Sequence, residues 1–163
     1  MADHPISSIE VRSLLDVAIH RLLENDTYLF EHDLHERTIT HKLAEYLQPL
    51  FPAWNVDCEY NRDGHEPKRV RLGDPPEPEW DQGSNVFPDI IVHQRGNNDH
   101  NLLIVEAKKA RHARPAIDPY DRMKISAFSR DLSYRFGAAI LFAVGTEPGA
   151  RVHLSFYSNG EWT

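Results

Sequence analysis

The chain has 163 residues, 40% of them hydrophobic, and this length and composition fit one globular domain with a core rather than a disordered chain. Its single cysteine, Cys58, excludes an internal disulfide framework, fits a reducing cytoplasm and leaves structural zinc without its usual thiolates. With 25 acidic against 18 basic residues the net charge is −7, which argues against broad coating of nucleic acid but leaves room for a local basic cleft. No apolar run approaches the roughly 20 residues of a membrane span, and the polar start does not resemble a secretory signal, so we expect a cytoplasmic protein without a membrane segment.

Two helices are predicted before the first strand. Residues 6–24 repeat apolar side chains at helical spacing, and Ser7 with Glu10 matches a capping box at the start. A second helix is predicted over residues 34–50, and Glu36 lies on its apolar stripe. Because Asp33 and Glu36 also have the spacing of a helix N-terminus, Glu36 either caps this helix or supports a site elsewhere.

Three strands and a long loop are predicted next. Residues 54–60 alternate and are rich in strand formers, with Glu59 near the end as a secondary site candidate. Residues 61–85 form a long loop rich in proline, glycine and charge, which we expect to cover a substrate groove. Two apolar strands follow, at about 86–93 and 101–107, joined by a polar hairpin turn.

Charged residues interrupt these two strands where a buried strand does not tolerate them. Asp89 lies in the first, and Glu106 and Lys108 share one face at the end of the second. Apolar residues on both faces indicate helices on both sides of the sheet, and burying unpaired charge costs several kcal/mol. The three groups therefore indicate a site; the alternative is a Glu106–Lys108 or Asp89–Lys108 ion pair that locks the sheet.

The rest of the chain completes an α/β fold. A helix is predicted over about 119–135, and strands over 138–144 and 151–157. The element order is αα-β-ββ-α-ββ, which predicts a central mixed sheet of about five strands flanked by helices. We expect one domain over residues 1–163.

The pattern Pro88-Asp89, then 16 residues, then Glu106-Ala107-Lys108 resembles the PD-(D/E)xK signature of restriction-endonuclease-like nucleases. Glu36 matches the further acidic residue common on the preceding helix of that superfamily, and Lys124 resembles the basic residue often carried by the helix after the motif. The resemblance covers about residues 33–145, with residues 1–30 as a helical addition, and implies a restriction-endonuclease-like core.

This resemblance implies metal-dependent phosphodiester chemistry. Hard oxygen ligands from Asp89, Glu106, Glu36 and the Ala107 carbonyl suit Mg²⁺, with Mn²⁺ as a substitute. Lys108 would orient or deprotonate the attacking water, or pair with the phosphate. The basic side chains expected to contact nucleic acid are Lys109, Arg111, Arg114, Lys124 and Arg62, although the run after Lys108 also fits a solvated helix or loop start. Histidines 32, 35 and 41 lack the cysteine partners or HExxH pattern of a zinc site.

The leading functional hypothesis is a Mg²⁺-dependent nuclease that hydrolyses phosphodiester bonds of DNA in restriction, repair or mobile-element systems. The expected partners are DNA and either a second copy of the chain or a larger defence or repair complex. The alternative is a catalytically inactive nucleic-acid-binding or assembly subunit with the same fold. A third hypothesis is an unrelated α/β scaffold with an internal ion pair.

Overall fold

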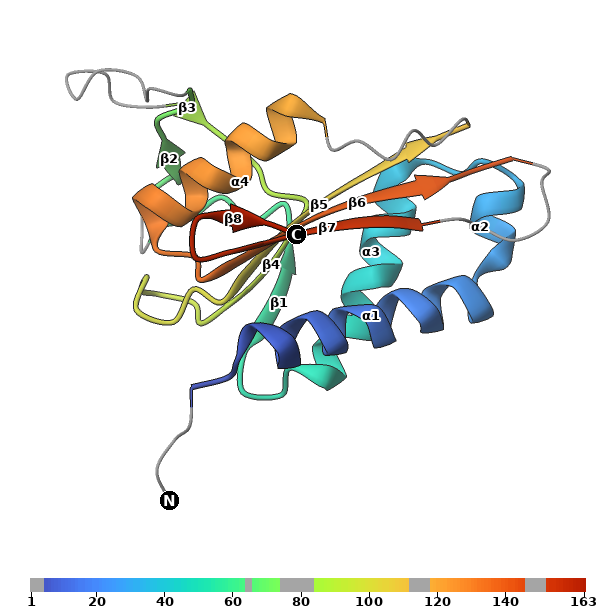
Figure 1. The fold of residues 1–163 in the computed structure, drawn as a ribbon, viewed down its shortest axis with the longest axis horizontal. Helices are drawn as coiled ribbons and strands as arrows, with labels where there is room; N and C mark the ends of the chain where they lie inside the picture. Colours follow the sequence, from blue (N-terminus) through green and yellow to red (C-terminus); the bar gives the residue numbers. More distant parts are fainter. Residues whose placement is uncertain (1–4, 64–65, 74–83, 112–117, 146–151) are drawn as a thin grey trace.

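The centre of the molecule is a six-stranded mixed sheet (Figure 1), and the computed structural model describes residues 5–63, 66–73, 84–111, 118–145 and 152–163. Only β5 and β6 run parallel; every other neighbouring pair in the sheet is antiparallel. In spatial order the strands are β1 (Asn55–Cys58), β4 (Ile90–His93), β5 (Leu103–Ala110), β6 (Phe136–Ala143), β7 (Val152–Ser158) and β8 (Glu161–Trp162). A separate two-stranded sheet pairs β2 (Arg69–Val70) with β3 (Ser84–Asn85).

Four α-helices are described, and each predicted helix is confirmed. They are α1 (Ser8–Asn25), α2 (Thr27–Glu31), α3 (Glu36–Leu47) and α4 (Pro119–Leu132), and a 3-10 turn (Gln48–Leu50) follows α3. The capping box of α1 forms as predicted: the backbone N–H of Glu10 donates to Ser7 Oγ at 3.2 Å, and the backbone N–H of Ser7 donates to the Glu10 carboxylate at 2.8 Å. This exchange satisfies two amides that the first turn cannot pair internally.

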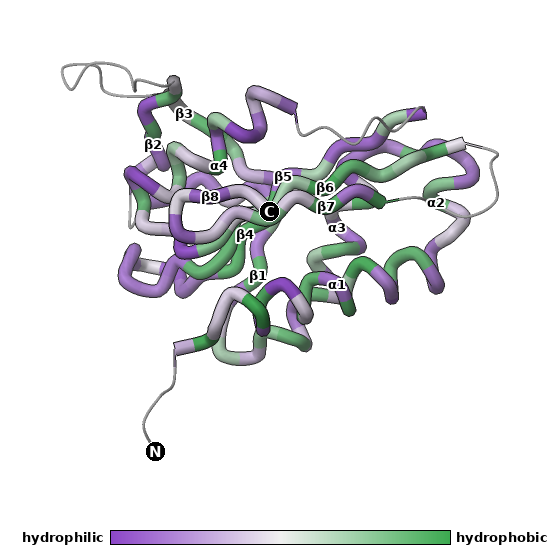
Figure 2. The backbone as a smooth tube through the Cα atoms, in the orientation of Figure 1, coloured by the Kyte–Doolittle hydropathy of each residue, from purple (hydrophilic) through white to green (hydrophobic). Residues whose placement is uncertain are grey.

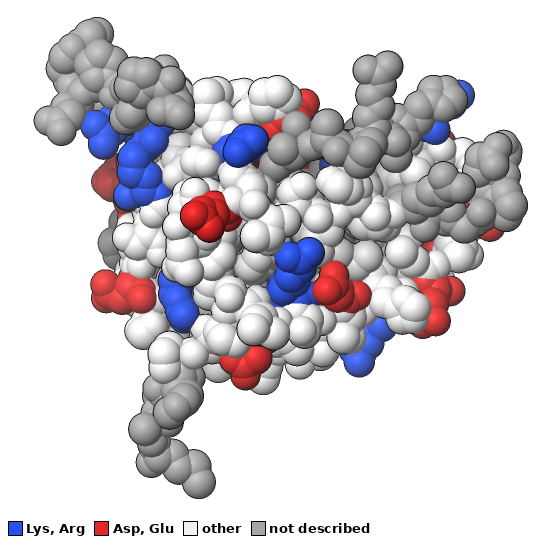
Figure 3. Space-filling view, viewed as in Figure 1, with Lys and Arg blue, Asp and Glu red and all other residues white. Residues whose placement is uncertain are grey.

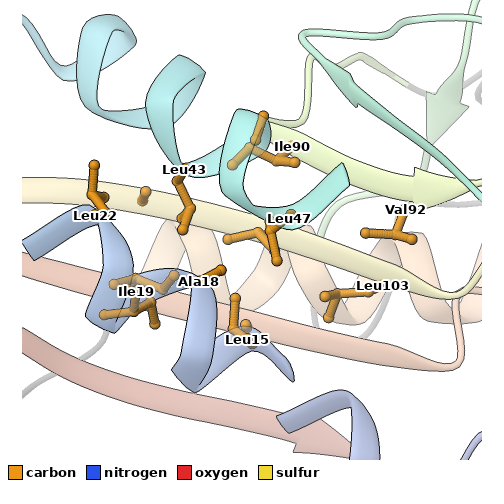
Figure 4. Packing of buried hydrophobic residues seen from close by; sticks show 14 of the residues in the cluster. Leu15, Ala18, Ile19, Leu22, Leu43, Leu47, Ile90, Val92 and Leu103 are labelled. Carbon is orange, nitrogen blue, oxygen red and sulfur yellow. The ribbon is translucent and has the colours of Figure 1, made fainter. Parts of the chain in front are cut away.

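Two hydrophobic clusters lie on opposite faces of the sheet. The larger one joins α1 and α3 to β5 through residues such as Leu15, Leu43 and Leu103, which Figure 4 shows pointing toward one another. The smaller one joins α4 to the other face through Ile125, Phe128 and Ile104. Hydrophobic residues recur along α1 and through the central strands (Figure 2), which is the pattern of a sheet covered on both sides. The α/β class with a mixed sheet between helices is therefore confirmed.

A buried lysine attaches residues 66–73 to α4 and to Tyr134, which follows this helix. The Lys68 side chain is 1% exposed, and its ammonium donates to the Tyr134 hydroxyl at 2.6 Å. The rings of Tyr60, Phe128 and Tyr134 surround the ammonium at 4.9–5.9 Å from their centroids. Burial lowers the pKa of Lys68 to about 8.

Most differences from the predicted elements are short. The strand predicted over 86–93 begins only at Ile90, so Asp89 precedes β4 rather than interrupting it. The sequence predicted neither α2, of five residues, nor β8, of two, and β8 raises the strand number from about five to six. The 61–85 segment carries β2 and β3 rather than loop alone, and residues 64–65 and 74–83 of it lie outside the described residues. Within the described ranges, no helix is both long and apolar enough to cross a membrane.

The unequal lengths of β4 and β5 position the candidate site. The register of this antiparallel pair places Ile90 opposite Val105, where the pairing ends, yet β5 continues to Ala110. Beyond Val105, β5 keeps β6 on one side and turns its other side toward Asp89 and α3.

Candidate active site

Two carboxylates take the place of a neighbouring strand along this side of β5. The backbone N–H of Ala107 donates to Asp89 Oδ2 at 2.8 Å, and that of Lys109 donates to Glu36 Oε2 at 3.1 Å. Because the N–H and C=O of one strand residue point to the same side, the Ala107 carbonyl also lies on this side. Asp89, Glu36 and the Ala107 carbonyl thus line one edge of β5.

Glu36 reaches β5 and does not cap its own helix. The N-cap of α3 is His35, whose Nδ1 accepts from the Arg37 backbone N–H at 3.2 Å. Asp33, the other member of the predicted cap, accepts from the Lys109 ammonium at 2.8 Å and holds Arg111 at 3.2 Å. Of the two sequence alternatives, the geometry favours the supporting role for Glu36.

The acidic side chains Glu36, Asp89, Glu106 and Asp121 lie around this end of β5, and Glu106 is the most deeply buried of this acidic cluster. Its side chain is 3% exposed, and Oε2 accepts from Lys124 Nζ at 2.9 Å. In the part of the chain that the structure describes, its other oxygen, Oε1, is buried without a hydrogen-bond partner. Burial, reinforced by the negative charge of Asp89 and opposed by Lys124, raises the pKa of Glu106 to about 8. The site therefore holds a buried carboxyl oxygen that no donor among the described residues satisfies.

Lys124 lies inside the protein. The sequence analysis placed it against nucleic acid, but its side chain is 9% exposed and its ammonium also donates to the Phe87 carbonyl at 2.7 Å. Contact with a phosphate would require this lysine to leave both partners. In the structure its role is to hold Glu106.

Lys108 lies on the α4 face of β5, as the alternation predicted, but faces different carboxylates. Its Nζ lies 3.6 Å from Asp121 Oδ1 and 3.9 Å from Asp118 Oδ2. Partial burial lowers the pKa of Lys108, but Asp121, Asp118 and Glu36 together outweigh it and hold that pKa above its usual value. Among the described residues, Glu106 pairs with Lys124 and Lys108 lies near Asp121 and Asp118, so neither the Glu106–Lys108 nor the Asp89–Lys108 ion pair is present.

Asp121 is a member of this cluster that the sequence analysis missed. It is 5% exposed, and burial together with the charges of Asp118 and Asp89 raises the pKa of Asp121 to about 6, against the effects of Lys108 and Lys124. Acidic residues are common in the first turn of a helix because they interact favourably with the helix dipole, so Asp121 did not stand out in the sequence. Its position three residues before Lys124, on the same side of α4, is the signal that identifies it.

The donor chemistry of this cluster suits Mg²⁺, although its present arrangement is not that of a bound metal. Within the described ranges, no three His, Cys, Asp or Glu side chains form a group that could hold a metal ion. Carboxylate and carbonyl oxygens are nevertheless the ligands that Mg²⁺ prefers, and the buried Glu106 Oε1 is an acceptor that a cation would satisfy. The metal site predicted from the sequence stays a prediction.

The basic residues predicted to contact nucleic acid are mostly engaged with acidic partners. Lys109 and Arg111 both bond Asp33, and Lys109 also donates to the Leu34 carbonyl at 2.8 Å. Arg62 is exposed beside Asp63, which accepts from Asn98 in the β4–β5 hairpin, at the far end of β5 from Lys108. Arg114 lies outside the described residues. On the face drawn in Figure 3, basic and acidic side chains are interspersed.

Glu59, the secondary candidate, pairs with a cation of α3. Its carboxylate lies 3.0 Å from Arg37 Nε, and both side chains are about half exposed or more. Its backbone N–H donates to the Asp89 carbonyl at 3.2 Å, which ties the end of β1 to the start of β4. Glu59 thus borders the cluster through its backbone.

A cavity of about 370 Å³ opens beside Lys108. The register places Lys108, Leu141 and His153 side by side on β5, β6 and β7, so they form one row on the α4 face of the sheet. The lining residues are Lys108, Lys109, Ala110, Asp118, Pro119, Asp121, Ala139, Ile140, Leu141 and His153. The cavity therefore combines the charged cluster with apolar sheet surface.

Comparisons with protein-family models, with curated proteins and with solved structures find no match for this chain.

Proposed function

We propose that this protein is a metal-dependent nuclease that hydrolyses phosphodiester bonds, with DNA as substrate. One observation carries the proposal: Glu36, 73 residues from Lys109 in sequence, meets the edge of β5 where Asp89 bonds Ala107. The PD-(D/E)xK resemblance requires such a convergence of a helical glutamate with the two halves of the motif. A helix cap or a local ion pair gives no reason for it.

Asp89, Glu106, Glu36 and the Ala107 carbonyl are the groups that would hold Mg²⁺ or Mn²⁺. When bound, the metal supplies a Lewis acid and lowers the pKa of a water molecule. Lys124 keeps Glu106 in place through the 2.9 Å contact. Glu36 and Asp89 fix the backbone of β5, and so the direction of the Ala107 carbonyl.

Lys108 acts as a cation in this proposal. With a pKa held above its usual value, its amine is protonated at neutral pH and does not serve as the base. A protonated amine beside the site neutralises negative charge that grows on the phosphate and orients the attacking water. Asp121 and Asp118 position that amine.

The finer assignments belong to the same proposal. The fold would be a restriction-endonuclease-like core, in a cytoplasmic protein of a restriction, repair or mobile-element system. A chain of 163 residues would act as a homodimer or within a larger complex.

The test is a cleavage assay with labelled single-stranded and duplex DNA and RNA in Mg²⁺, Mn²⁺ or EDTA. Asp89→Asn and Lys108→Met should each lower metal-dependent cleavage by at least about 100-fold, because each removes a group that stabilises developing charge. Asp16→Asn and Lys42→Met are matched controls on α1 and α3 and should cut like the parent. Full cleavage by the Asp89 and Lys108 variants would show that the site is wrong.

One observation favours a second candidate, a nucleic-acid-binding or assembly subunit without catalysis. Lys124 already bonds Glu106 at 2.9 Å, so this carboxyl group has a cationic partner without a metal. This candidate predicts that oligonucleotides bind but are not cut in either metal. It also predicts that Mg²⁺ leaves the melting temperature of the protein unchanged, whereas a metal that binds the folded state raises it.

A further inference from the structure

Two exposed aromatic residues, Phe87 and Tyr120, lie close in sequence to the acidic residues Asp89 and Asp121. Among the described residues, five large hydrophobic side chains are exposed, and Phe87 (57%) and Tyr120 (48%) are two of them. Phe87 lies two residues before Asp89, and Tyr120 directly precedes Asp121. An exposed aromatic ring beside a polar cleft offers a flat apolar face to a ligand.

The contacts of Lys124 place the backbone of Phe87 next to the Glu106 carboxylate. Its ammonium bonds the Phe87 carbonyl and Glu106 at once. Tyr120 precedes Lys124 by four residues, so it lies one turn away on the same side of α4. The Phe87 backbone, just before β4, and the first turn of α4 with Tyr120 therefore flank the Lys124–Glu106 pair.

The charges near the site do not suit a duplex. Recognition of double-stranded DNA rests largely on lysines and arginines that neutralise many phosphates. Here Lys109 and Arg111 share Asp33, Lys124 is buried against Glu106, and Lys108 lies beside Asp121. With a net charge of −7 as well, phosphate neutralisation alone gives this site weak binding, and stacking would add to it.

We propose that this site binds single-stranded nucleic acid, with unpaired bases stacked on Phe87 and Tyr120. Unpaired bases have free faces, whereas the faces of bases within a duplex are covered by their neighbours. The 370 Å³ cavity is lined by Pro119, Asp121 and Lys108 and by neither ring, so the stacking surface is the exposed faces of Phe87 and Tyr120 rather than the cavity wall. The inference rests on the proposed nuclease function for the cleavage step and names the substrate class of that site.

The experiment measures binding of the full chain to oligonucleotides of about 12 nucleotides in EDTA, so that cleavage does not interfere. Fluorescence anisotropy compares single-stranded DNA, single-stranded RNA and duplex DNA. An oligonucleotide with 2-aminopurine reports stacking directly, because its fluorescence is quenched when the base stacks. Phe87→Ala and Tyr120→Ala are compared with Phe87→Trp and Tyr120→Phe, which keep a ring. Tyr28→Ala, an aromatic on α2 that is 62% exposed, is the matched control.

Single strands should bind at least about tenfold more tightly than the duplex. Each alanine variant should weaken single-strand binding by about 5- to 140-fold, which corresponds to 1–3 kcal/mol per stacked base, and should reduce the quenching. The tryptophan and phenylalanine variants and Tyr28→Ala should bind like the parent. Circular dichroism melting checks that every variant is folded.

Equal or tighter binding of the duplex would overturn the inference, and so would alanine variants that bind and quench like the parent. The latter result would leave the two rings as contacts for a protein partner. Single-strand stacking without cleavage in Mg²⁺ or Mn²⁺ would support this inference and contradict the nuclease proposal. Cleavage of duplex DNA that neither alanine variant affects would support the nuclease and contradict this inference.

Discussion

The Lys124→Met substitution tests how strongly the stability of the protein depends on the Lys124–Glu106 pair. Methionine keeps most of the apolar stem of lysine but lacks the ammonium that bonds Glu106 Oε2 at 2.9 Å and the Phe87 carbonyl at 2.7 Å. Glu106 is 3% exposed, and in the described structure its Oε1 has no partner. The variant therefore leaves a buried carboxyl group with no counter-charge bonded to it.

The size of the loss should depend on pH. Below the Glu106 pKa of about 8 the carboxyl group is largely protonated, so at pH 7 the variant loses hydrogen bonds from a charged donor, about 1.5–3 kcal/mol. At pH 9 the carboxylate is ionised in the parent, and the variant bears the cost of a lone buried charge, about 3–5 kcal/mol. The sign follows from linkage. Folding raises the pKa of this carboxyl group, so the protein becomes less stable as pH rises from the unfolded-state pKa to the folded-state pKa. The variant raises the folded-state pKa further, which extends the loss to higher pH.

Urea denaturation at pH 7 and pH 9 measures the loss of unfolding free energy at each pH. In a thermal melt the same loss lowers Tm by about 2–4 °C per kcal/mol for a chain of this length. The double variant Lys124→Met/Glu106→Gln should recover most of the loss at pH 9, because no charge remains buried. An equal loss at the two pH values, or a double variant as unstable as the sum of the single ones, would refute the reasoning.

Three further predictions concern other parts of the molecule. Burial lowers the pKa of Lys68 to about 8, so between pH 8 and pH 10.4 the folded parent binds fewer protons than the unfolded chain, and its stability rises with pH by up to about 3 kcal/mol. Lys68→Met should abolish this rise. Urea denaturation across this pH range measures the difference, and parallel stability curves for parent and variant would contradict the prediction. Gly137→Ala should lower stability by about 1–3 kcal/mol, since its Cβ would lie 2.2 Å from Ile125 Cγ2; an unchanged Tm in a melting experiment would be the contrary result. Asp33→Asn should release Lys109 and Arg111 and so tighten binding of single-stranded oligonucleotides. The slope of log binding constant against log salt concentration should steepen by up to about 1.4. An unaltered slope in anisotropy titrations would show that these two cations do not reach phosphate.

The position of Glu106 joins stability to the proposed function. A buried carboxylate next to Asp89 destabilises the fold, as its raised pKa shows, and an amide or apolar side chain would fit the sheet with less strain. Proteins retain such groups where activity requires them. In the proposed site the requirement is an oxygen ligand for Mg²⁺.

Local sequence patterns predicted the long elements and the faces of β5. The 3.6-residue period of α1 and its Ser7–Glu10 box appear in the structure because they depend only on neighbouring residues. The two-residue alternation placed Glu106 and Lys108 on one face and Val105 and Ala107 on the other. The elements α2 and β8 were missed because five and two residues are too few to show a period.

The sequence by itself determined which residue types stand at the ends of β4 and β5, and that these strands are covered on both sides. Only the tertiary structure decided their partners: Glu106 pairs with Lys124, Lys108 lies beside Asp121, and Glu36 accepts from the Lys109 backbone. These choices depend on how far β5 extends beyond β4 and on where α4 crosses the sheet. Contacts across such sequence distances are set by packing, which no local period records.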